Sequence, residues 1–205
     1  MLLDRFDLSG RVAVVTGAGR GIGRGIALGL AEAGADVVCA ARTQDDIEET
    51  AAAVRVRGCE ALAQRCDVMQ TADLEALVEA TLDRFARFDL LVNNAGGTGP
   101  RPALETSEAF FENALRFNVT APFLLSRLAI PRMVETAGGG AIVNISSRSS
   151  DMVQTGFVAY AAGKAALNMV TRNLAAEVAP KVRTREDQDR GAGVGAPGHC
   201  LDGDR

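Results

Sequence analysis

Histidine is nearly absent from this chain of 205 residues. Its single histidine, His199, lies in a polar, glycine-rich stretch near the C-terminus. A Ser-His-Asp triad needs a histidine that accepts the serine proton. The sequence therefore gives almost no support to hydrolysis by such a triad.

Cysteine is also scarce. The four cysteines are Cys39, Cys59, Cys66 and Cys200, and no two of them form a CxxC pair. Three of them lie in or beside predicted strands, where a free cysteine behaves as a small apolar side chain. We therefore expect neither a disulfide framework nor a bound metal.

Long apolar runs and basic clusters are missing as well. No run approaches the roughly 18 apolar residues of a membrane span, and Asp4 and Asp7 interrupt any leader-like segment. The net charge is −4, without a basic patch that would suit nucleic acid. We expect a cytoplasmic protein that binds neither membranes nor nucleic acids.

Apolar runs alternate with amphipathic stretches along the first 180 residues. "RVAVVT", at 11–16, is a β-branched run without alternation, as expected of a strand buried on both faces of a parallel sheet. Four further strands are expected at 36–41, 60–66, 89–94 and 141–146, with helices between them. This order predicts an α/β fold with a Rossmann-like doubly wound parallel sheet in one domain.

Prolines mark irregular points in two of the predicted helices. The long helix after residue 110 should be kinked at Pro122, because proline removes an intrahelical hydrogen bond. The helix that starts near Val158 should stop before Pro180.

The pattern stops near Arg183. Residues 181–205 contain few apolar side chains and many glycines, so they cannot offset the entropy of ordering. We expect a domain at 1–180 whose C-terminal strands are missing, followed by a disordered tail at 181–205.

A glycine-rich turn, "TGAGRGIG" at 16–23, joins the first strand to the first helix. Backbone N–H groups and the helix dipole converge on a phosphate at such a position. The spacing differs from G-x-G-x-x-G, so the motif alone also fits a tight turn without a ligand.

The end of the second strand bears on the choice of cofactor. An acidic residue there would bind a ribose 2'-hydroxyl, whereas an arginine would accommodate a 2'-phosphate. This chain has Ala41 and Arg42, and Arg20 lies in the glycine turn. We expect a preference for NADP(H) over NAD(H), although Arg42 also fits the start of a solvated helix.

Tyr160 and Lys164 in "YAAGK" lie four residues apart, on one face of a predicted helix. An ammonium near a phenol favours the phenolate and so prepares it for acid-base work. A solvated surface pair would have the same spacing, so the pair alone is weak evidence.

Together, the motifs of residues 8–183 resemble those of the short-chain dehydrogenase/reductase family. They occur in the family's order: "TGAGRGIG", "CDV" (66–68), "NNAG" (93–96), Asn118, "NISS" (144–147) and "YAAGK". The resemblance implies an NAD(P)-dependent oxidoreductase that interconverts a carbonyl and an alcohol.

The resemblance also implies a role for each matching residue. Tyr160 would exchange a proton with the substrate oxygen, and Lys164 would favour the phenolate and hold the nicotinamide ribose. Ser147 would hydrogen-bond the substrate oxygen, and Asn118 would hold a water molecule that links the lysine to solvent. These four are the candidate catalytic residues.

The candidate cofactor-binding residues come from the same motifs. Asp67 and Val68 would contact adenine, and 94–96 would line the adenosine side. The full predicted set is Gly17, Gly19, Arg20, Gly21, Ile22, Gly23, Arg42, Asp67, Val68, Asn94, Ala95, Gly96, Tyr160 and Lys164.

The substrate is less defined. The loop "NNAGGTGPRP" resembles that of bacterial hydroxysteroid dehydrogenases, and it also fits 3-oxoacyl reductases and sugar dehydrogenases. Fold-level resemblance supports a reaction type better than a substrate. We expect a small carbonyl or alcohol substrate.

The family continues after this helix with a sixth strand, a substrate lid and a seventh strand. Their absence after Arg183 fits a shifted reading frame, a truncated remnant, or a short variant that completes its sheet with another chain. The abrupt change of composition favours the first, and translating the other frames downstream of codon 183 tests it. The alternative function is then a catalytically impaired, nucleotide-binding fragment. Any oligomer would be at most a dimer, through the helices of Asn118 and Tyr160.

Overall fold

A computed structural model describes residues 6–179 and 181–187 of the chain. Its centre is one sheet of six parallel strands in the order β3-β2-β1-β4-β5-β6. The strands are β1 (Val12–Thr16), β2 (Asp36–Ala41), β3 (Ala61–Arg65), β4 (Leu90–Asn93), β5 (Gly140–Ile145) and β6 (Val182–Asp187). The sheet confirms the predicted α/β class and the first five predicted strands.

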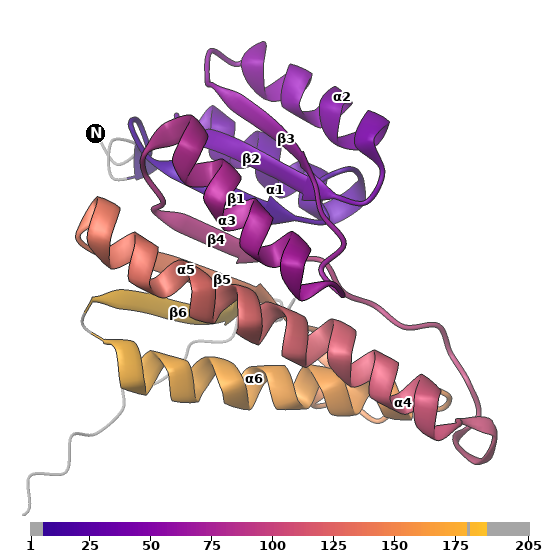
Figure 1. The fold of residues 1–205 in the computed structure, drawn as a ribbon. Helices are drawn as coiled ribbons and strands as arrows, with labels where there is room; N and C mark the ends of the chain where they lie inside the picture. Colours follow the sequence, from indigo (N-terminus) through magenta and orange to yellow (C-terminus); the bar gives the residue numbers. More distant parts are fainter. Residues whose placement is uncertain (1–5, 180, 188–205) are drawn as a thin grey trace, which may run out of the picture.

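Helices cover both faces of this sheet (Figure 1). The main helices are α1 (Gly21–Glu32), α2 (Gln44–Arg55), α3 (Thr71–Phe85), α4 (Glu108–Leu115), α5 (Ala121–Ala137) and α6 (Val158–Val178). In Figure 1, α3 and α5 cross in front of the sheet and α1 lies behind it. Within the described residues, no helix combines the length and apolarity that crossing a membrane requires.

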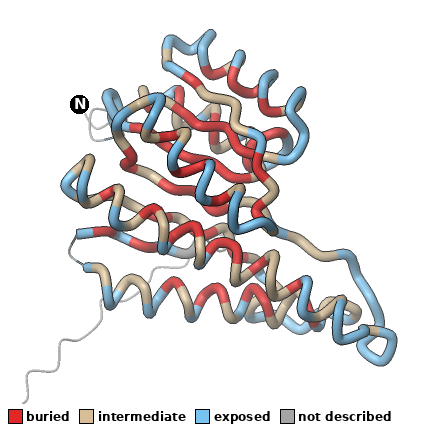
Figure 2. The backbone as a smooth tube through the Cα atoms, in the orientation of Figure 1, coloured by how far each residue is buried: buried red, intermediate tan, exposed pale blue. Residues whose placement is uncertain are grey.

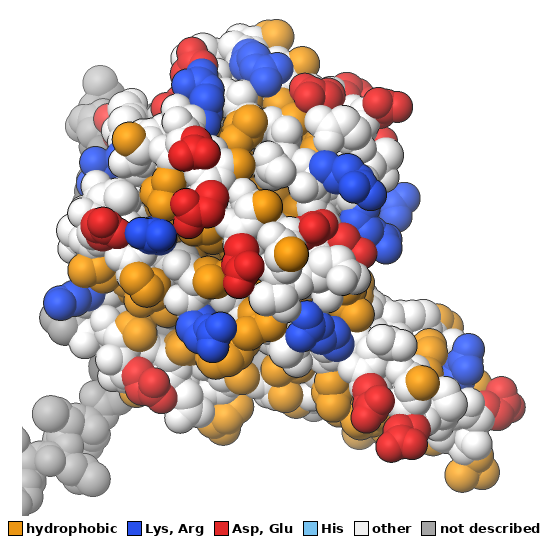
Figure 3. All heavy atoms as spheres, viewed as in Figure 1, with side chains coloured by type: hydrophobic (Ala, Val, Ile, Leu, Met, Phe, Trp, Pro, Cys, Tyr) orange, Lys and Arg blue, Asp and Glu red, His pale blue; other side chains and the backbone are white. Residues whose placement is uncertain are grey.

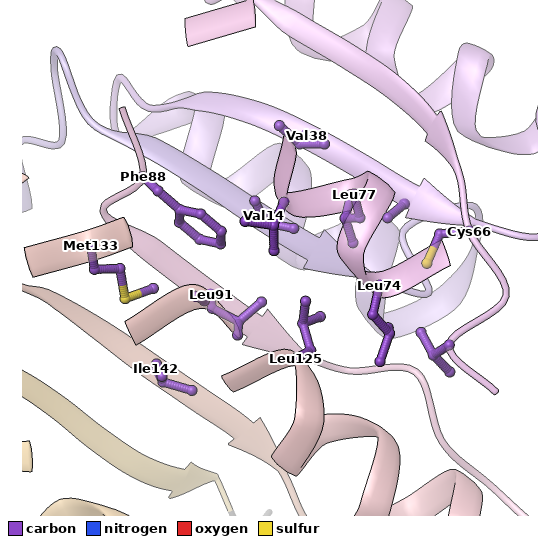
Figure 4. Close-up of a cluster of buried hydrophobic side chains, with 14 of the residues drawn as sticks. Val14, Val38, Cys66, Leu74, Leu77, Phe88, Leu91, Leu125, Met133 and Ile142 are labelled. Atoms are coloured by element: carbon purple, nitrogen blue, oxygen red, sulfur yellow. The ribbon is translucent and has the colours of Figure 1, made fainter. Parts of the chain in front are cut away.

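The strands alternate their side chains between two apolar cores. Val14 and Leu91 face α3 and α5, where they pack with Leu74 and Leu125 (Figure 4). Their chain neighbours face the other way and pack against α1 and α2. All five residues of β1 are buried, and Figure 2 shows burial concentrated along the strands. This explains why β1 is apolar throughout rather than alternating with polar residues.

An irregular turn lies directly before Pro122, close to the predicted kink. The irregular turn is a π-helical segment at Arg116–Thr120, directly before α5, in which the Ala121 N–H bonds to the Arg116 carbonyl. Pro122 follows inside a helix that continues from α4 through the π segment into α5, so its missing N–H removes one intrahelical bond next to the irregular turn. Single π turns often mark functional positions, and this one contains Asn118.

The expectation that no sixth strand follows α6 is wrong. β6 pairs in parallel with β5, from Gly140 opposite Val182 to Ile145 opposite Asp187. Val182 and Thr184 are buried while Arg183 and Arg185 are exposed, so the segment has the period of a strand although it is polar. The backbone N–H and C=O groups along the edge of β5 are available to pair with this segment, which favours its strand conformation. The rest of the predicted disordered tail, 188–205, lies outside the described residues.

Candidate active site

A cleft of about 620 Å³ opens where the carboxyl ends of the strands meet. The segments that follow β1, β2, β3 and β4 line it, together with the end of β5 and the start of α6. The connections leave β1 toward β2 and β4 toward β5, in opposite directions across the sheet. Ligands bind open α/β sheets at such a switch point.

Every residue predicted to contact the cofactor lines this cleft, from Gly17 in the glycine turn to Lys164 in α6. The lining also includes residues that the sequence analysis did not assign to the site. These are Ala41, Thr43, Asp46, Cys66, Phe117, Ile145 and Ser146. Ala41, Cys66, Ile145 and Ser146 belong to stretches that the sequence analysis singled out, and Phe117 is next to Asn118, whereas Thr43 and Asp46 carried no sequence signal as site residues.

The glycine turn is closed by contacts that leave no room for side chains. A Cβ on Gly23 would lie 2.2 Å from the Gly17 carbonyl oxygen, and one on Gly19 would lie 2.8 Å from Asp46 Cβ. Gly17 itself has a φ of 67°, which an L side chain rarely adopts. The turn thus brings the N-terminus of α1 close to the cleft, with its first amides available to an anion.

Asn94 and Thr16 tie the ends of β4 and β1 together beneath the turn. Asn94 Nδ2 donates to the Thr16 carbonyl at 2.9 Å, and Thr16 Oγ1 accepts from the amides of Asn94 and Ala95, both at 3.0 Å. These bonds give Asn94 a role in holding the floor of the cleft.

Two arginines and one aspartate stand at the end of the cleft near β2 and β3. Arg20 and Arg42 are exposed, and within the described part of the chain their guanidinium groups have no assigned partner. Asp67 is fixed in place, because its Oδ1 accepts from the Met69 amide at 3.1 Å and its N–H donates to Asp73 Oδ2 at 2.8 Å.

Tyr160 and Lys164 lie at the opposite end of the cleft. Lys164 Nζ donates to the Ile145 carbonyl at 2.7 Å and lies 5.9 Å from the centre of the Tyr160 ring. Lys164 is only 4% exposed, and burial lowers the pKa of its amine from 10.5 to about 8. The lysine therefore stays charged at neutral pH, beside the phenol.

Asn118 meets Lys164 at Gly96. A Cβ on Gly96 would lie 3.0 Å from Asn118 Oδ1 and 3.1 Å from Lys164 Nζ, so only glycine leaves both polar atoms free to approach. Asn118 is fully buried, its Oδ1 accepts from the Gly97 amide at 2.9 Å, and its Nδ2 donates to the Ala114 carbonyl at 2.9 Å. The structure thus brings three of the four predicted catalytic residues together.

Ser147, the fourth, stands one residue beyond the cleft lining. It precedes a short 3-10 helix at Arg148–Ser150, and its Oγ accepts from the Ser149 amide at 3.2 Å. The serine that lines the cleft is Ser146, whose hydroxyl donates to Asn168 Oδ1 at 2.5 Å. The catalytic role of Ser147 stays a prediction.

The buried Lys164 should make the stability of the ligand-free protein depend on pH. Its folded pKa of about 8 lies below the ordinary value of 10.5, so the folded protein binds fewer protons than the unfolded chain between these values. The cost of burying the ammonium is thus complete below about pH 8 and disappears as the pH rises through 10.5. Relative to Lys164→Met, the free energy of unfolding of the unmodified protein should rise across this window. Urea denaturation from pH 7 to 10.5 measures it, and a constant difference between the two proteins contradicts the burial argument.

Comparison with known proteins identifies the family. The family model described as short chain dehydrogenase matches residues 11–185. The chain is 40% identical to an uncharacterized oxidoreductase of Mycobacterium tuberculosis over 183 residues, which span 89% of this chain and 70% of that protein. It is 38% identical to the 7alpha-hydroxysteroid dehydrogenase of Escherichia coli K12 over 178 residues, which span 87% of this chain and 69% of the relative.

A solved structure extends the similarity to the fold. A 7alpha-hydroxysteroid dehydrogenase in complex with NADH and 7-oxo glycochenodeoxycholic acid superposes with a TM-score of 0.85 at 36% identity, covering 90% of this chain and 71% of that one. The segment that the family model matches includes every residue that lines the cleft. The chain belongs to the short-chain dehydrogenase/reductase family, whose members are oxidoreductases that transfer hydride with a nicotinamide cofactor.

Proposed function

We propose that this protein transfers a hydride between NADP(H) and a small carbonyl or secondary-alcohol substrate. The observation that carries the proposal is the convergence of Tyr160, Lys164 and Asn118 at one end of a cleft that continues past the glycine turn to the ends of β2 and β3. A dinucleotide needs such an arrangement, because its adenine and its nicotinamide lie at the two ends of an extended molecule with the pyrophosphate between them.

The residues of the cleft fit this cofactor. The backbone of the glycine turn can fold this tightly and leave room for a phosphate only because Gly17, Gly19 and Gly23 carry no Cβ. The N-terminus of α1 favours a phosphate there, and Asp67 and Val68 flank the position proposed for the adenine ring. The nicotinamide ring, when bound, supplies or accepts the hydride.

Residues of this chain carry out the proton transfer of the reaction. Tyr160 donates a proton to the carbonyl oxygen in reduction and takes it back in oxidation. Lys164 favours the phenolate by its charge and offers donors to the ribose, while Asn118 holds the backbone of Gly97 beside it. Ser147 is assigned to hydrogen-bond the substrate oxygen, and its hydroxyl can donate that bond while its Oγ still accepts from the Ser149 amide.

The preference for NADP(H) rests on Arg20 and Arg42. Both line the cleft, and neither guanidinium has an assigned partner within the described residues, so both can take up a 2'-phosphate. β2 ends at Ala41 without the carboxylate that would accept from a 2'-hydroxyl.

Replacing Arg42 should weaken NADPH binding selectively. Arg42→Ala removes a charge-assisted contact of roughly 1.5–3 kcal/mol, so the Kd for NADPH should rise about tenfold or more while that for NADH changes little. Titration of cofactor fluorescence measures both constants. Arg65→Ala is the control, because Arg65 is exposed near Arg42 but does not line the cleft. An unchanged Kd for NADPH in Arg42→Ala would refute the proposed preference.

Purified protein of this sequence tests the proposed reaction. Binding of NADPH together with turnover of at least one member of a panel of steroid, sugar, 3-oxoacyl and simple ketones supports it. Binding without turnover selects the alternative, a catalytically impaired nucleotide-binding protein. The steroid arm is motivated by the relatives named as 7alpha-hydroxysteroid dehydrogenases.

A homodimer through α5 and α6 is part of the proposal. α6 packs against α4 and against the π segment that leads into α5. In Figure 1, α5 and α6 approach each other toward α4, and in Figure 3 apolar side chains are spread over this side of the molecule. Phe123 on α5 is 37% exposed and Met169 on α6 is 55% exposed, so a partner would cover apolar surface that now faces solvent. Sedimentation velocity distinguishes this dimer from a monomer.

A further inference from the structure

Three buried polar side chains form one stripe along α6. Lys164, Asn168 and Thr171 are spaced four and three residues apart, so they lie on the same face of the helix. They are 4%, 3% and 2% exposed, respectively. We refer to these three residues as the α6 polar stripe.

Each member of the α6 polar stripe bonds a different residue at the end of β5. Lys164 Nζ donates to the Ile145 carbonyl at 2.7 Å. Asn168 Oδ1 accepts from Ser146 Oγ at 2.5 Å, and Thr171 Oγ1 accepts from Asn144 Nδ2 at 2.9 Å. Three successive residues, 144 to 146, are thereby tied to one helix face.

These bonds fix how far α6 can slide along β5. Apolar contacts are non-directional and tolerate small shifts, whereas a hydrogen bond loses strength steeply outside a narrow range of distance and angle. Breaking a buried hydrogen bond also leaves a polar group without water. The stripe therefore sets one register of α6 against the strand.

The register matters because Tyr160 is on the same helix, one turn before Lys164. One residue of slide along a helix is about 1.5 Å, and a misplacement of about 1 Å can cost on the order of 100-fold in rate. Lys164 touches the proposed reaction directly, but Asn168 does not line the cleft. Any effect of Asn168 must act through Ser146, which does line it.

We propose that Asn168 is a positioning residue for proton transfer by Tyr160. By holding Ser146, it places the Ile145 carbonyl against Lys164 and presents Ser147, the next residue, toward the substrate. The inference rests on the proposed function for its effect on rate, but the positioning of the 145–147 segment is a property of the free protein.

The first test compares kinetics with cofactor binding. Asn168→Ala and Ser146→Ala should each lower kcat about tenfold, with the Kd for NADPH within about twofold of the unmodified protein. The double variant should be no slower than either single one, because both remove the same contact. Ser146→Thr keeps the hydroxyl and should restore most of the rate. Asn173→Ala is the matched control, since Asn173 is exposed on the same helix and bonds only the Met169 carbonyl.

The second test needs no turnover. Amide hydrogen exchange in the absence of ligand should be faster at 145–149 in Asn168→Ala than in Asn173→Ala, with the rest of α6 and β5 unchanged. If the unmodified protein turns over no substrate, the proposed function fails, and this comparison still decides the inference. Unchanged exchange at 145–149 overturns it. The inference is also overturned if the loss of kcat in the double variant equals the product of the two single losses. It is overturned as well if the affinity for NADPH falls by the same factor as kcat.

Discussion

Tyr160→Phe should lower kcat for ketone reduction by about 10³-fold, within the 10²–10⁴ range expected for loss of a general acid. The substitution removes only the phenolic oxygen. The ring keeps its edge-to-face contact with Phe157, at 6.3 Å between centroids, so the helix should keep its packing. Single-turnover reduction, followed by the loss of NADPH absorbance, measures the rate of the chemical step.

The Tyr160 result is informative only if the cofactor still binds. The Kd for NADPH and the unfolding midpoint of Tyr160→Phe should both match those of the unmodified protein. Val158→Ala is the control. Val158 is exposed and lies two residues before Tyr160 on α6, so kcat should not change in this variant. A rate for Tyr160→Phe within threefold of normal would exclude Tyr160 as the proton donor.

Gly23→Ala should disrupt the cofactor turn more than any other single methyl group added to the described chain. The new Cβ would lie 2.2 Å from the Gly17 carbonyl oxygen and 2.4 Å from Asn94 Nδ2, and neither neighbour is a flexible chain end. Asn94 is itself bonded to the Thr16 carbonyl, so relief requires moving the end of β1. We expect a loss of about 1–3 kcal/mol in stability and at least a tenfold rise in the Kd for NADPH.

Gly25→Ala is the matched control for Gly23→Ala. Gly25 lies in the same helix two residues later, and a Cβ there meets no atom within 4 Å. Alanine is favoured over glycine inside a helix by about 0.5–1 kcal/mol, so this variant should be slightly more stable and bind NADPH normally. Thermal unfolding and fluorescence titration of the two variants measure the contrast. Equal behaviour of the two would show that crowding at the turn does not control cofactor binding.

The local pattern of the chain was sufficient to predict the strands but not the irregular points. β1 could be predicted from the sequence because a strand buried on both faces must be apolar throughout. β6 was not predicted because it has only one apolar residue, the buried Val182. Its strand conformation depends on backbone hydrogen bonds to β5, which the local sequence does not show. Pro122 predicted an irregular point in this helix, but the form of that irregularity, a π turn directly before the proline, depends on which carbonyl each N–H bonds.

The candidate site shows the same division between sequence and tertiary structure. Gly17, Tyr160 and Lys164 were predicted from the order of the motifs and the family resemblance that it carries, because the spacing alone also fits a tight turn and a solvated pair. Asp46 and Ser146 entered the cleft lining only through the approach of α2 and β5 to the glycine turn and to α6.

By itself the sequence determined the fold class and the positions of the first five strands, and its resemblance to the family nominated the residues expected to carry the chemistry. The tertiary structure decided which of them meet: Gly96 between Asn118 and Lys164, and Asn168 against Ser146. The physical reason is the range of the interactions involved. Hydrophobic periodicity and turn chemistry act over a few residues, whereas the protonation of a buried lysine and the register of α6 depend on groups from distant parts of the chain that only folding brings within hydrogen-bonding distance.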